Sequence, residues 1–163
     1  MDHAGTGARL IIVCGLPGAG KTTLARWLEG RYQAIRLAPD EWMAELGIDL
    51  YDEGARAKVE SLQWKLGQAL LARRLVVIVE WGTWGRSERD ALRLAAGALG
   101  ASVELRHVSA TPEVLFERIR RRAREDPPIT REAIAHWQSL FQAPTEVEFA
   151  LFDPPLHPDP SNT

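Results

Sequence analysis

The residues with the clearest chemical meaning stand near the beginning of the chain. An apolar run at 10–13 leads into a glycine-rich segment that ends in Lys21 and Thr22 and follows the pattern G-x-x-x-x-G-K-[ST]. Glycines let consecutive backbone N–H groups turn toward a phosphate chain, and the positive end of the next helix faces the same anion. The pattern therefore predicts a phosphate-binding loop, or P-loop, between a buried strand and a helix.

Each residue type in this loop has a role in holding a nucleotide. Lys21 is expected to place its charge at the β- and γ-phosphates, and Thr22 to offer its hydroxyl to Mg²⁺. The predicted phosphate-binding residues are Gly15, Pro17, Gly18, Ala19, Gly20, Lys21, Thr22 and Thr23. An ordinary glycine turn is the alternative, but the complete motif with both flanks favours nucleotide binding.

Two carboxylates are expected beside the loop because each follows a predicted strand. Glu80 closes the apolar run at 75–80, and Asp40 follows a short strand at 34–37. Ligands of parallel sheets bind outside the carboxyl ends of the strands. We expect Glu80 to hold Mg²⁺ with Thr22, directly or through water, and Asp40 to accept the proton of a hydroxyl. The alternatives are that Glu80 only meets solvent and that Asp40 is the N-cap of the next helix.

Five arginines are concentrated in residues 118–124. Arg118 and Arg122 are four residues apart and share a helix face, so we expect them to act together on a phosphoryl group in transfer. The others, Arg120, Arg121 and Arg124, extend the charge. A solvated face that interacts favourably with the helix C-terminus is the alternative for any one of them.

Two tryptophans stand in the predicted loop after Glu80, in the segment 81–89. Facing the sheet edge, they would form an aromatic wall for an acceptor substrate, with an arginine contacting it. The alternative is that they pack on their own domain. The candidate acceptor-binding residues are Asp40, Trp42, Trp81, Trp84, Arg86 and Arg89.

Alternating strands and helices are predicted to position these residues. The expected strands are 10–13, 34–37, 75–80, 103–107 with one less protected face, and a weak final strand at 147–152. The expected helices are 21–28 closed by Gly30, 40–46, 55–73, 86–99, one opening at Thr111, and 129–140. This order predicts an α/β fold of the P-loop NTPase type. We expect a three-layer sandwich with about five mainly parallel strands, helices on both faces and a short lid at about 122–131.

The length of 163 residues suits about one domain. We expect a flexible segment at 1–8, a domain at 9–152 and a proline-rich tail at 153–163 that packs little. A net charge of −2 gives no general affinity for nucleic acid or acidic membranes. No apolar run approaches a membrane span and no signal segment is visible, so a cytoplasmic location is expected, with Cys14 as a buried thiol.

These residues together resemble the P-loop kinases of the zeta-toxin, chloramphenicol-phosphotransferase and polynucleotide-kinase type, often called predicted AAA-type ATPases. The resemblance covers about residues 9–152. Segment 37–42 is similar to the strand-end Asp region of that family, which implies that Asp40 is the catalytic base. The other similar segments are 82–89, with its aromatic and arginine residues, the R-x-x-x-R at 118–122 before the lid, and 141–146 after the lid helix. Glu80 stands where many relatives have Asp, and the chain lacks a clear terminal helix after its last strand.

The resemblance and the residues imply a phosphotransferase that uses ATP and Mg²⁺. It would move the γ-phosphate to a hydroxyl of a small-molecule acceptor of the antibiotic, sugar or nucleotide-sugar type. Its catalytic residues would be Asp40, Lys21, Arg118 and Arg122. A polynucleotide 5′-hydroxyl kinase is the alternative enzyme, and the net charge argues mildly against it. A nucleotide-dependent binding switch with slow ATPase activity is the alternative of another class, while the lack of an Asn-Lys-x-Asp segment disfavours a GTPase. The sequence indicates no oligomeric state.

Overall fold

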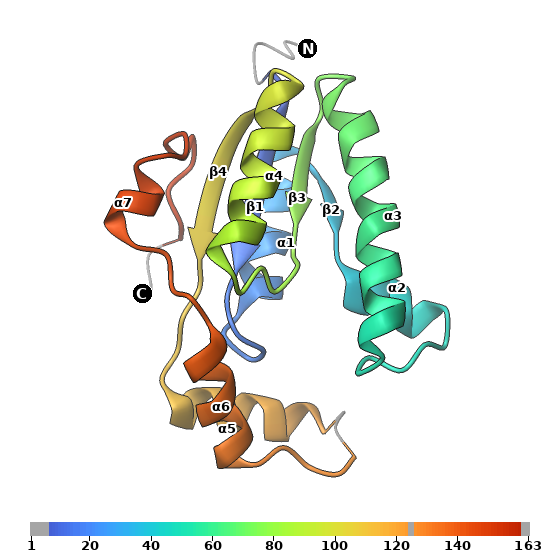
Figure 1. The fold of residues 1–163 in the computed structure, drawn as a ribbon, viewed down its shortest axis with the longest axis vertical. Coiled ribbons are helices and arrows are strands. Elements are labelled where there is room, and N and C mark those ends of the chain that lie inside the picture. Colours follow the sequence, from blue (N-terminus) through green and yellow to red (C-terminus); the bar gives the residue numbers. More distant parts are fainter. Residues whose placement is uncertain (1–6, 124–125, 161–163) are drawn as a thin grey trace.

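A four-stranded parallel sheet forms the centre of the molecule. The computed structural model describes residues 7–123 and 126–160 (Figure 1). The strands are β1 (Arg9–Cys14), β2 (Ile35–Leu37), β3 (Val76–Val79) and β4 (Ser102–His107), in the order β2-β3-β1-β4. Because β1 pairs in parallel with both β3 and β4, the carboxyl ends of three strands meet at one edge. The expected α/β fold of the P-loop NTPase type is confirmed.

Helices cover both faces of this sheet. Helix α1 (Lys21–Tyr32) packs on one face, and α3 (Glu53–Leu71) and α4 (Arg86–Ala98) pack on the other. The side chains of β1 alternate between the two layers. Leu10, Ile12 and Cys14 join the core under α3 and α4, and Ile11 and Val13 join the core under α1. Burial raises the pKa of Cys14 to about 11, so its thiol is the inert, buried one expected.

The remaining helices lie around the edges of the sheet. Helix α2 (Pro39–Glu45) follows β2, and α7 (Glu146–Phe149) lies beside β4. Helices α5 (Pro112–Arg122) and α6 (Arg131–Leu140) pack together at the carboxyl edge (Figure 1). Their apolar residues form a third cluster with side chains of the P-loop. The P-loop is therefore held between the sheet and the α5–α6 pair.

Several helix ends differ from expectation. Helix α1 continues through Gly30 to Tyr32, and it ends where Gln33 takes a left-handed conformation with φ of 50°. The N-cap of α2 is Ala38 with Pro39 at the first helical position, so Asp40 lies inside the first turn and is not the cap. Thr111 caps α5 as expected, by accepting a hydrogen bond from the amide of Val114.

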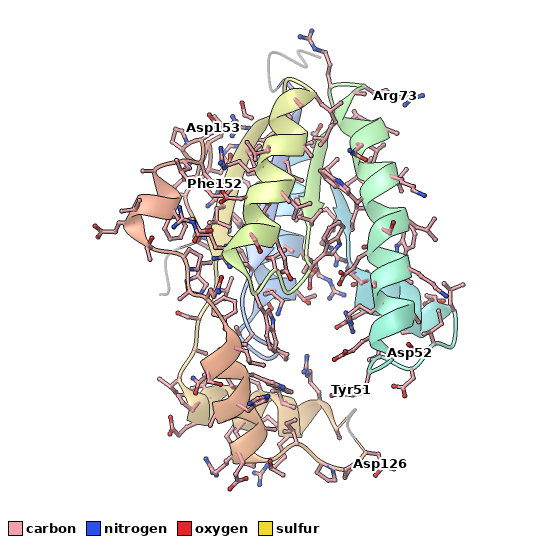
Figure 2. The ribbon with its side chains drawn as sticks, viewed as in Figure 1. Tyr51, Asp52, Arg73, Asp126, Phe152 and Asp153 are labelled. Atoms are coloured by element: carbon pink, nitrogen blue, oxygen red, sulfur yellow. The ribbon has the colours of Figure 1, made fainter. Side chains whose placement is uncertain are left out.

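The final strand expected at 147–152 is wrong. Residues 146–149 form α7, whose N-cap Thr145 accepts from the amide of Glu148. After α7, Asp153 meets the edge of β4, where its amide donates to Val103 O at 2.8 Å and its carboxylate accepts from Val103 N at 2.7 Å (Figure 2). In the described part of the chain the sheet therefore has four strands, because a capped helix prevails over the β-propensity of this segment.

The face of β4 that was expected to be less protected is buried. Glu104 has no exposed surface and accepts hydrogen bonds from Arg9 at 2.7 Å, Tyr32 at 2.9 Å and Arg106 at 2.8 Å. Arg106 also pairs with Asp159 and donates to the carbonyl of His157 at 2.7 Å. The described tail, 153–160, is largely exposed, but Asp153, His157 and Asp159 attach it to β4 by polar contacts.

Arg89 is also buried, and its expected contact with an acceptor is wrong. Its guanidinium pairs with both carboxylate oxygens of Glu148, at 2.6 and 2.9 Å. It donates to the carbonyls of Thr83 at 2.8 Å and Gln142 at 2.7 Å. Arg89 has no exposed surface, so it joins the loop after β3 to the segment after α6 and cannot meet a substrate.

Most of the expected flexible segment 1–8 lies outside the described residues, while Ala8 is buried and its carbonyl accepts from the amide of Ser102 at 3.0 Å. Within 7–123 and 126–160, the helices are too short or too polar to span a membrane.

Replacing Arg89 with methionine is expected to lower the free energy of unfolding by about 3–5 kcal/mol, because Glu148 is then buried without a partner charge. Urea unfolding followed by circular dichroism measures the change. Arg86→Met is the matched control, since Arg86 is exposed on the same helix and its loss should cost less than about 0.5 kcal/mol. Equal effects of the two substitutions would show that the buried pair is not a major source of stability.

Candidate active site

The P-loop joins β1 to α1 and presents free backbone donors. Helix α1 begins at Lys21, and its N-cap Gly20 has φ of 109° and supplies no side-chain cap. The first amides of a helix have no partner within the helix. These amides and the positive end of α1 form a site for an anion such as a phosphate group.

Two glycines of the loop are required by their surroundings. At Gly15, with φ of 156°, an added Cβ would lie 2.4 Å from the carbonyl oxygen of Val108. At Gly18, with φ of 80°, it would lie 3.0 Å from Ile119 on α5. The spaced glycines of the motif thus let the loop fit between the end of β4 and α5.

Lys21 lies under the loop, and its ammonium is partly desolvated. Its Nζ donates to the carbonyls of Gly15 at 2.9 Å and Leu16 at 3.0 Å. Burial lowers the pKa of Lys21 to about 8, the charges of Glu80 and Asp40 oppose this shift, and the charge of Arg122 adds to it. Three residues far apart in the sequence therefore act on the same ammonium group.

Glu80 and Thr22 meet as expected from their positions. The hydroxyl of Thr22 donates to Oε1 of Glu80, and Nη1 of Arg36 donates to Oε2 at 2.8 Å. The oxygens of Thr22 and Glu80 thus meet beside the N-terminus of α1. This arrangement suits a Mg²⁺ ion, which would take its other ligands from phosphate and water. The described residues contain no group of three or more metal-binding side chains, so the protein alone offers no complete cation cage.

Arg36 on β2 is a site residue that the sequence reasoning missed. Its guanidinium also holds Glu41 through two bonds of 2.8 and 2.9 Å, and Glu29 at 3.3 Å. Burial opposes its charge, but the bonds to Glu41 and Glu80 outweigh burial and raise the pKa of Arg36. Arg36 therefore stays charged and fixes the orientation of Glu80. No local pattern marks this role, because the three carboxylates come from three elements.

Asp40 lies in the first turn of α2 with its carboxylate open to solvent. Oδ1 pairs with Nη2 of Arg56 on α3 at 2.7 Å. Its charge opposes the lowering of the Lys21 pKa by burial. An exposed carboxylate held by an arginine, within electrostatic reach of Lys21, can orient a hydroxyl and receive its proton. Arg56 is a second residue that the sequence reasoning missed.

The tryptophans of the loop after β3 pack on the domain. The indole N–H of Trp81 donates to Gln63 at 3.0 Å, and its ring meets Trp64 edge-on in the core. The ring of Trp84 meets Trp137 of α6 at 6.3 Å. The packing alternative therefore holds for Trp81, which is not part of an aromatic wall, and Trp84 joins the loop to α6.

Two other acceptor candidates remain on the surface. Trp42 is partly exposed on α2, and Arg86 is exposed with a long ion pair of 3.9 Å to Asp90. Near the same edge, Tyr51 lies between α2 and α3 at the end that faces the α5–α6 pair (Figure 2). These positions leave Trp42 accessible beside Asp40, whereas Arg86 lies in the first turn of α4.

The arginines of α5 adjoin the P-loop from its outer side. Arg118 donates to the carbonyls of Gly18 at 3.2 Å and Ala19 at 3.1 Å. Arg122 is the last residue of α5, and its charge acts on Lys21. The lid expected at 122–131 includes residues 124–125, which lie outside the described part of the chain. The expected role of Arg124 is therefore not described by the structure.

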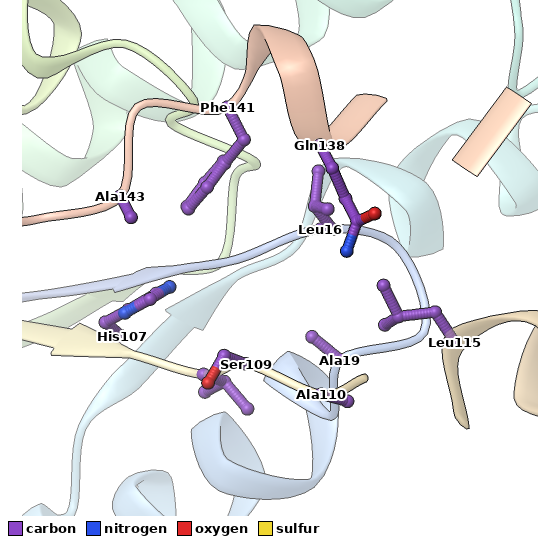
Figure 3. A pocket seen from close by; sticks show the side chains of 10 residues that line it. Leu16, Ala19, His107, Ser109, Ala110, Leu115, Gln138, Phe141 and Ala143 are labelled. Carbon is purple, nitrogen blue, oxygen red and sulfur yellow. The ribbon is translucent and has the colours of Figure 1, made fainter. Parts of the chain in front are cut away.

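A cavity of about 220 Å³ lies between the P-loop, the end of β4 and the α5–α6 pair (Figure 3). Its walls are Leu16, Ala19, His107, Val108, Ser109, Ala110, Leu115, Gln138, Phe141 and Ala143. The lining includes Leu16 and Ala19 of the P-loop but neither Lys21 nor Thr22, so the cavity adjoins the loop on the side of the α5–α6 pair. It belongs to the packing between the sheet and the α5–α6 pair.

Comparisons with known proteins agree with this geometry. The model of the AAA_33 family, described as an AAA domain, matches residues 10–144. No curated protein matches the chain significantly. A solved structure of a candidate kinase from Chloroflexus aurantiacus is 22% identical, with a TM-score of 0.63 over 84% of this chain and 79% of that one.

Two further structures share the fold. A gluconokinase from Sinorhizobium meliloti is 19% identical, with a TM-score of 0.57 over 86% of this chain and 78% of that one. A chain of the Pnkp1/Rnl/Hen1 RNA repair complex is 21% identical, with a TM-score of 0.68 over 85% of this chain and 45% of that one. At these identities the likeness concerns the fold, which is one that kinases use.

Nucleotide affinity is expected to fall above about pH 8, where Lys21 of the free protein loses its proton. Bound phosphates favour the charged ammonium, so above this pH Lys21 must take up a proton when the nucleotide binds. Because this proton becomes scarcer as the pH rises, the Kd of the nucleotide rises by roughly tenfold per pH unit. Calorimetric titration with ATP and Mg²⁺ across this range measures the slope. Lys21→Arg, which keeps its charge, should bind with little pH dependence. A slope unchanged by this substitution would contradict the role of Lys21.

Proposed function

We propose that the chain, which belongs to the AAA_33 family of AAA domains, is an ATP-dependent phosphotransferase that phosphorylates a hydroxyl of a small-molecule acceptor. The supporting observation is the placing of two carboxylates near the start of α1. Glu80 accepts from the hydroxyl of Thr22 on that helix, and Asp40 follows β2 in the first turn of α2, where Arg56 holds one of its oxygens at 2.7 Å. A P-loop that only binds a nucleotide does not need a carboxylate such as Asp40 opposite the phosphates, whereas transfer to a hydroxyl does.

The donor half of the site would hold ATP by its phosphates. The amides at the start of α1 and the ammonium of Lys21 would bind the β- and γ-phosphates. Mg²⁺, when bound, neutralises phosphate charge, and Thr22 and Glu80 would hold it directly or through water. Arg36 would keep Glu80 oriented toward Thr22, because it binds the other carboxylate oxygen.

The acceptor half would be built around Asp40. Its free carboxylate oxygen would accept the hydroxyl proton while the hydroxyl oxygen forms a bond to the γ-phosphorus. The bond from that phosphorus to the bridging oxygen of ADP breaks, and ADP leaves with the electron pair. Arg56 supports this role because it holds one oxygen of Asp40 at 2.7 Å.

Arg118 and Arg122 would act on the transferring group. Arg118 now donates to carbonyls of the P-loop, and Arg122 lies one turn farther along the same face of α5. A small movement of α5 would bring both guanidinium groups onto phosphate oxygens, where charge-assisted bonds are strongest. We propose that residues 9–152 form the kinase domain and that the lid lies at about 122–131.

A polynucleotide 5′-hydroxyl kinase is the second candidate. The chain of the RNA repair complex shares the fold, which makes this activity reasonable to test. The net charge of −2 and the carboxylates near Asp40 favour a small acceptor, since a polynucleotide needs a basic path.

Replacing Asp40 with asparagine is expected to lower the transfer rate by about 10²–10⁴-fold and to leave ATP affinity within about twofold of wild type, because Asn cannot accept the proton. Labelled ATP with a panel of hydroxyl-bearing metabolites, antibiotics, nucleotide sugars and 5′-hydroxyl oligonucleotides identifies the acceptor. The same assay measures the variant. Asp49→Asn is the control, because Asp49 is an exposed residue that follows the same helix. Transfer by Asp40→Asn at nearly the wild-type rate would exclude Asp40 as the base.

The binding-switch alternative makes a different prediction. A kinase should consume ATP rapidly only when an acceptor is present, whereas a switch should hydrolyse ATP slowly whether or not one is added. Comparison of ADP release with and without the panel separates the two. Slow hydrolysis that no member of the panel accelerates would favour the switch.

A further inference from the structure

The outward side of α3 is exposed and combines apolar with basic side chains. It lies opposite Val59 and Leu71, which the helix buries against the domain. Leu62 is 58% exposed and Leu66 is 40% exposed, and contiguous apolar groups of this kind mark interaction surfaces. We call this side the basic face, and it consists of Lys58, Leu62, Lys65, Leu66, Ala69 and Arg73.

The basic face is hollowed around Leu62. An open hollow on the surface of α3 is lined by Ala57, Lys58, Ser61, Leu62 and Lys65. Within residues 7–123 and 126–160, neither of these lysines pairs with a carboxylate. The lysines stand four positions before and three positions after Leu62, so they flank it along the helix. A partner that enters the hollow would therefore meet an apolar side chain between two positive charges.

A second exposed surface lies at α7 and has the opposite charge. Val147 is 70% exposed and Leu151 is 46% exposed. The two are four positions apart on one helical turn, which continues past α7 because the amide of Leu151 donates to the carbonyl of Glu148 at 3.0 Å. Segment 141–160 contains no Lys or Arg. We call this surface the acidic ridge, and it consists of Glu146, Val147, Ala150, Leu151 and Asp153.

Polar contacts with the domain hold the acidic ridge in place. Glu148, in the same helical turn, is buried and pairs with Arg89 at 2.6 Å. The carboxylate of Asp153 accepts from the amide of Val103 on β4 at 2.7 Å. These contacts fix the backbone on both sides of Leu151. The ridge therefore loses little conformational entropy when it binds another surface.

The two surfaces lie at opposite ends of the sheet. Helix α3 lies on the side of β2 and β3, whereas α7 lies beside β4, in a sheet with the order β2-β3-β1-β4 (Figure 1). A single copy therefore cannot close its own ridge onto its own basic face, yet it can present each surface to a different copy. A nucleic acid would also meet the positive charges, but it offers no aliphatic side chains to Leu62 and Leu66. The acidic ridge offers both kinds of group.

We propose that the acidic ridge of one copy packs on the basic face of another, so that the chain associates head to tail. Val147 and Leu151 enter the hollow around Leu62, and the carboxylates of the ridge lie near the lysines of the hollow. Apolar burial stabilises the contact, and the opposite charges set its orientation. Because the two surfaces differ, association continues to further copies unless a ring closes. The active-site residues proposed above belong to neither surface.

Sedimentation velocity of the full chain measures the association. Between ~10 and ~500 µM protein, the mean mass is expected to rise with concentration, because contacts between small surfaces are weak. The rise should be smaller at high salt, which screens the charges. Wild-type protein that stays monomeric over the whole range would overturn the proposal.

One exposed substitution on each surface locates the contact. Leu62→Glu places a negative charge in the hollow, and Val147→Lys places a positive charge on the ridge. Each should weaken association at least about tenfold, because each brings like charges together. Leu94→Glu is the matched control, since Leu94 is 62% exposed on α4 and belongs to neither surface. This control should associate like wild type.

A mixture of the two variants gives the most specific result. Leu62→Glu keeps its acidic ridge and Val147→Lys keeps its basic face. An equimolar mixture should therefore form a one-to-one dimer that cannot extend, although each variant alone stays monomeric. A mixture that remains monomeric would count against the head-to-tail contact. Loss of association in only one of the two variants would also do so, since it indicates a symmetric contact through a single surface.

Both variants should fold and bind ATP as the wild type does, because both positions are exposed and lie outside the proposed active site. If a charged variant unfolds, Leu62→Ser and Val147→Ser repeat the experiment without a new charge, and each should weaken association about fivefold. A labelled oligonucleotide that binds the wild type but not Leu62→Glu, while the protein stays monomeric, would assign the basic face to a polyanion and reject the self-association.

Discussion

The parallel pairing of β1 with both β3 and β4 decides where the functional groups lie. In a parallel arrangement the strands end at the same edge, so the P-loop after β1, Glu80 after β3 and the segment after β4 meet there. β1 is buried between two helical layers, so its register cannot slip without turning apolar side chains to the wrong layer. The short β2 adds Arg36 and, through α2, Asp40 to the same edge.

Buried arginines hold together the loops, helices and tail segments that the strands do not position. Arg36 joins Glu80 to α1 and α2, Arg89 joins the loop after β3 to the segment after α6, and Arg106 joins β4 to the tail. A guanidinium group suits this role because it has five donors in one plane and stays charged when buried. Each joins segments that are distant in the chain. The carboxylates used for chemistry are therefore supported by charges that take no direct part in it.

The sequence alone predicted the elements whose causes are local. The P-loop, the cap at Thr111 and the buried strands follow from residue types and spacing within a few positions. The failures have distant causes. Residues 147–152 have strand propensity, but Glu148 is drawn into the core by Arg89, and the alternation at Glu104 and Arg106 indicated an open face that Asp159 and His157 cover. Arg36 and Arg56 gave no signal, because their importance comes from partners on other elements.

The pairing of Arg106 with Asp159 also has a consequence for the order of synthesis. The two residues are 53 positions apart, so every strand of the sheet has been made well before Asp159. A nascent chain that already contains β1 to β4 can pair its strands, yet it still carries Arg106 without this partner on the sheet surface. The same chain already includes the P-loop and Glu80. During translation, the nucleotide-binding edge can thus assemble before the tail reaches Arg106 near the end of β4, and a bound nucleotide would stabilise that incomplete form.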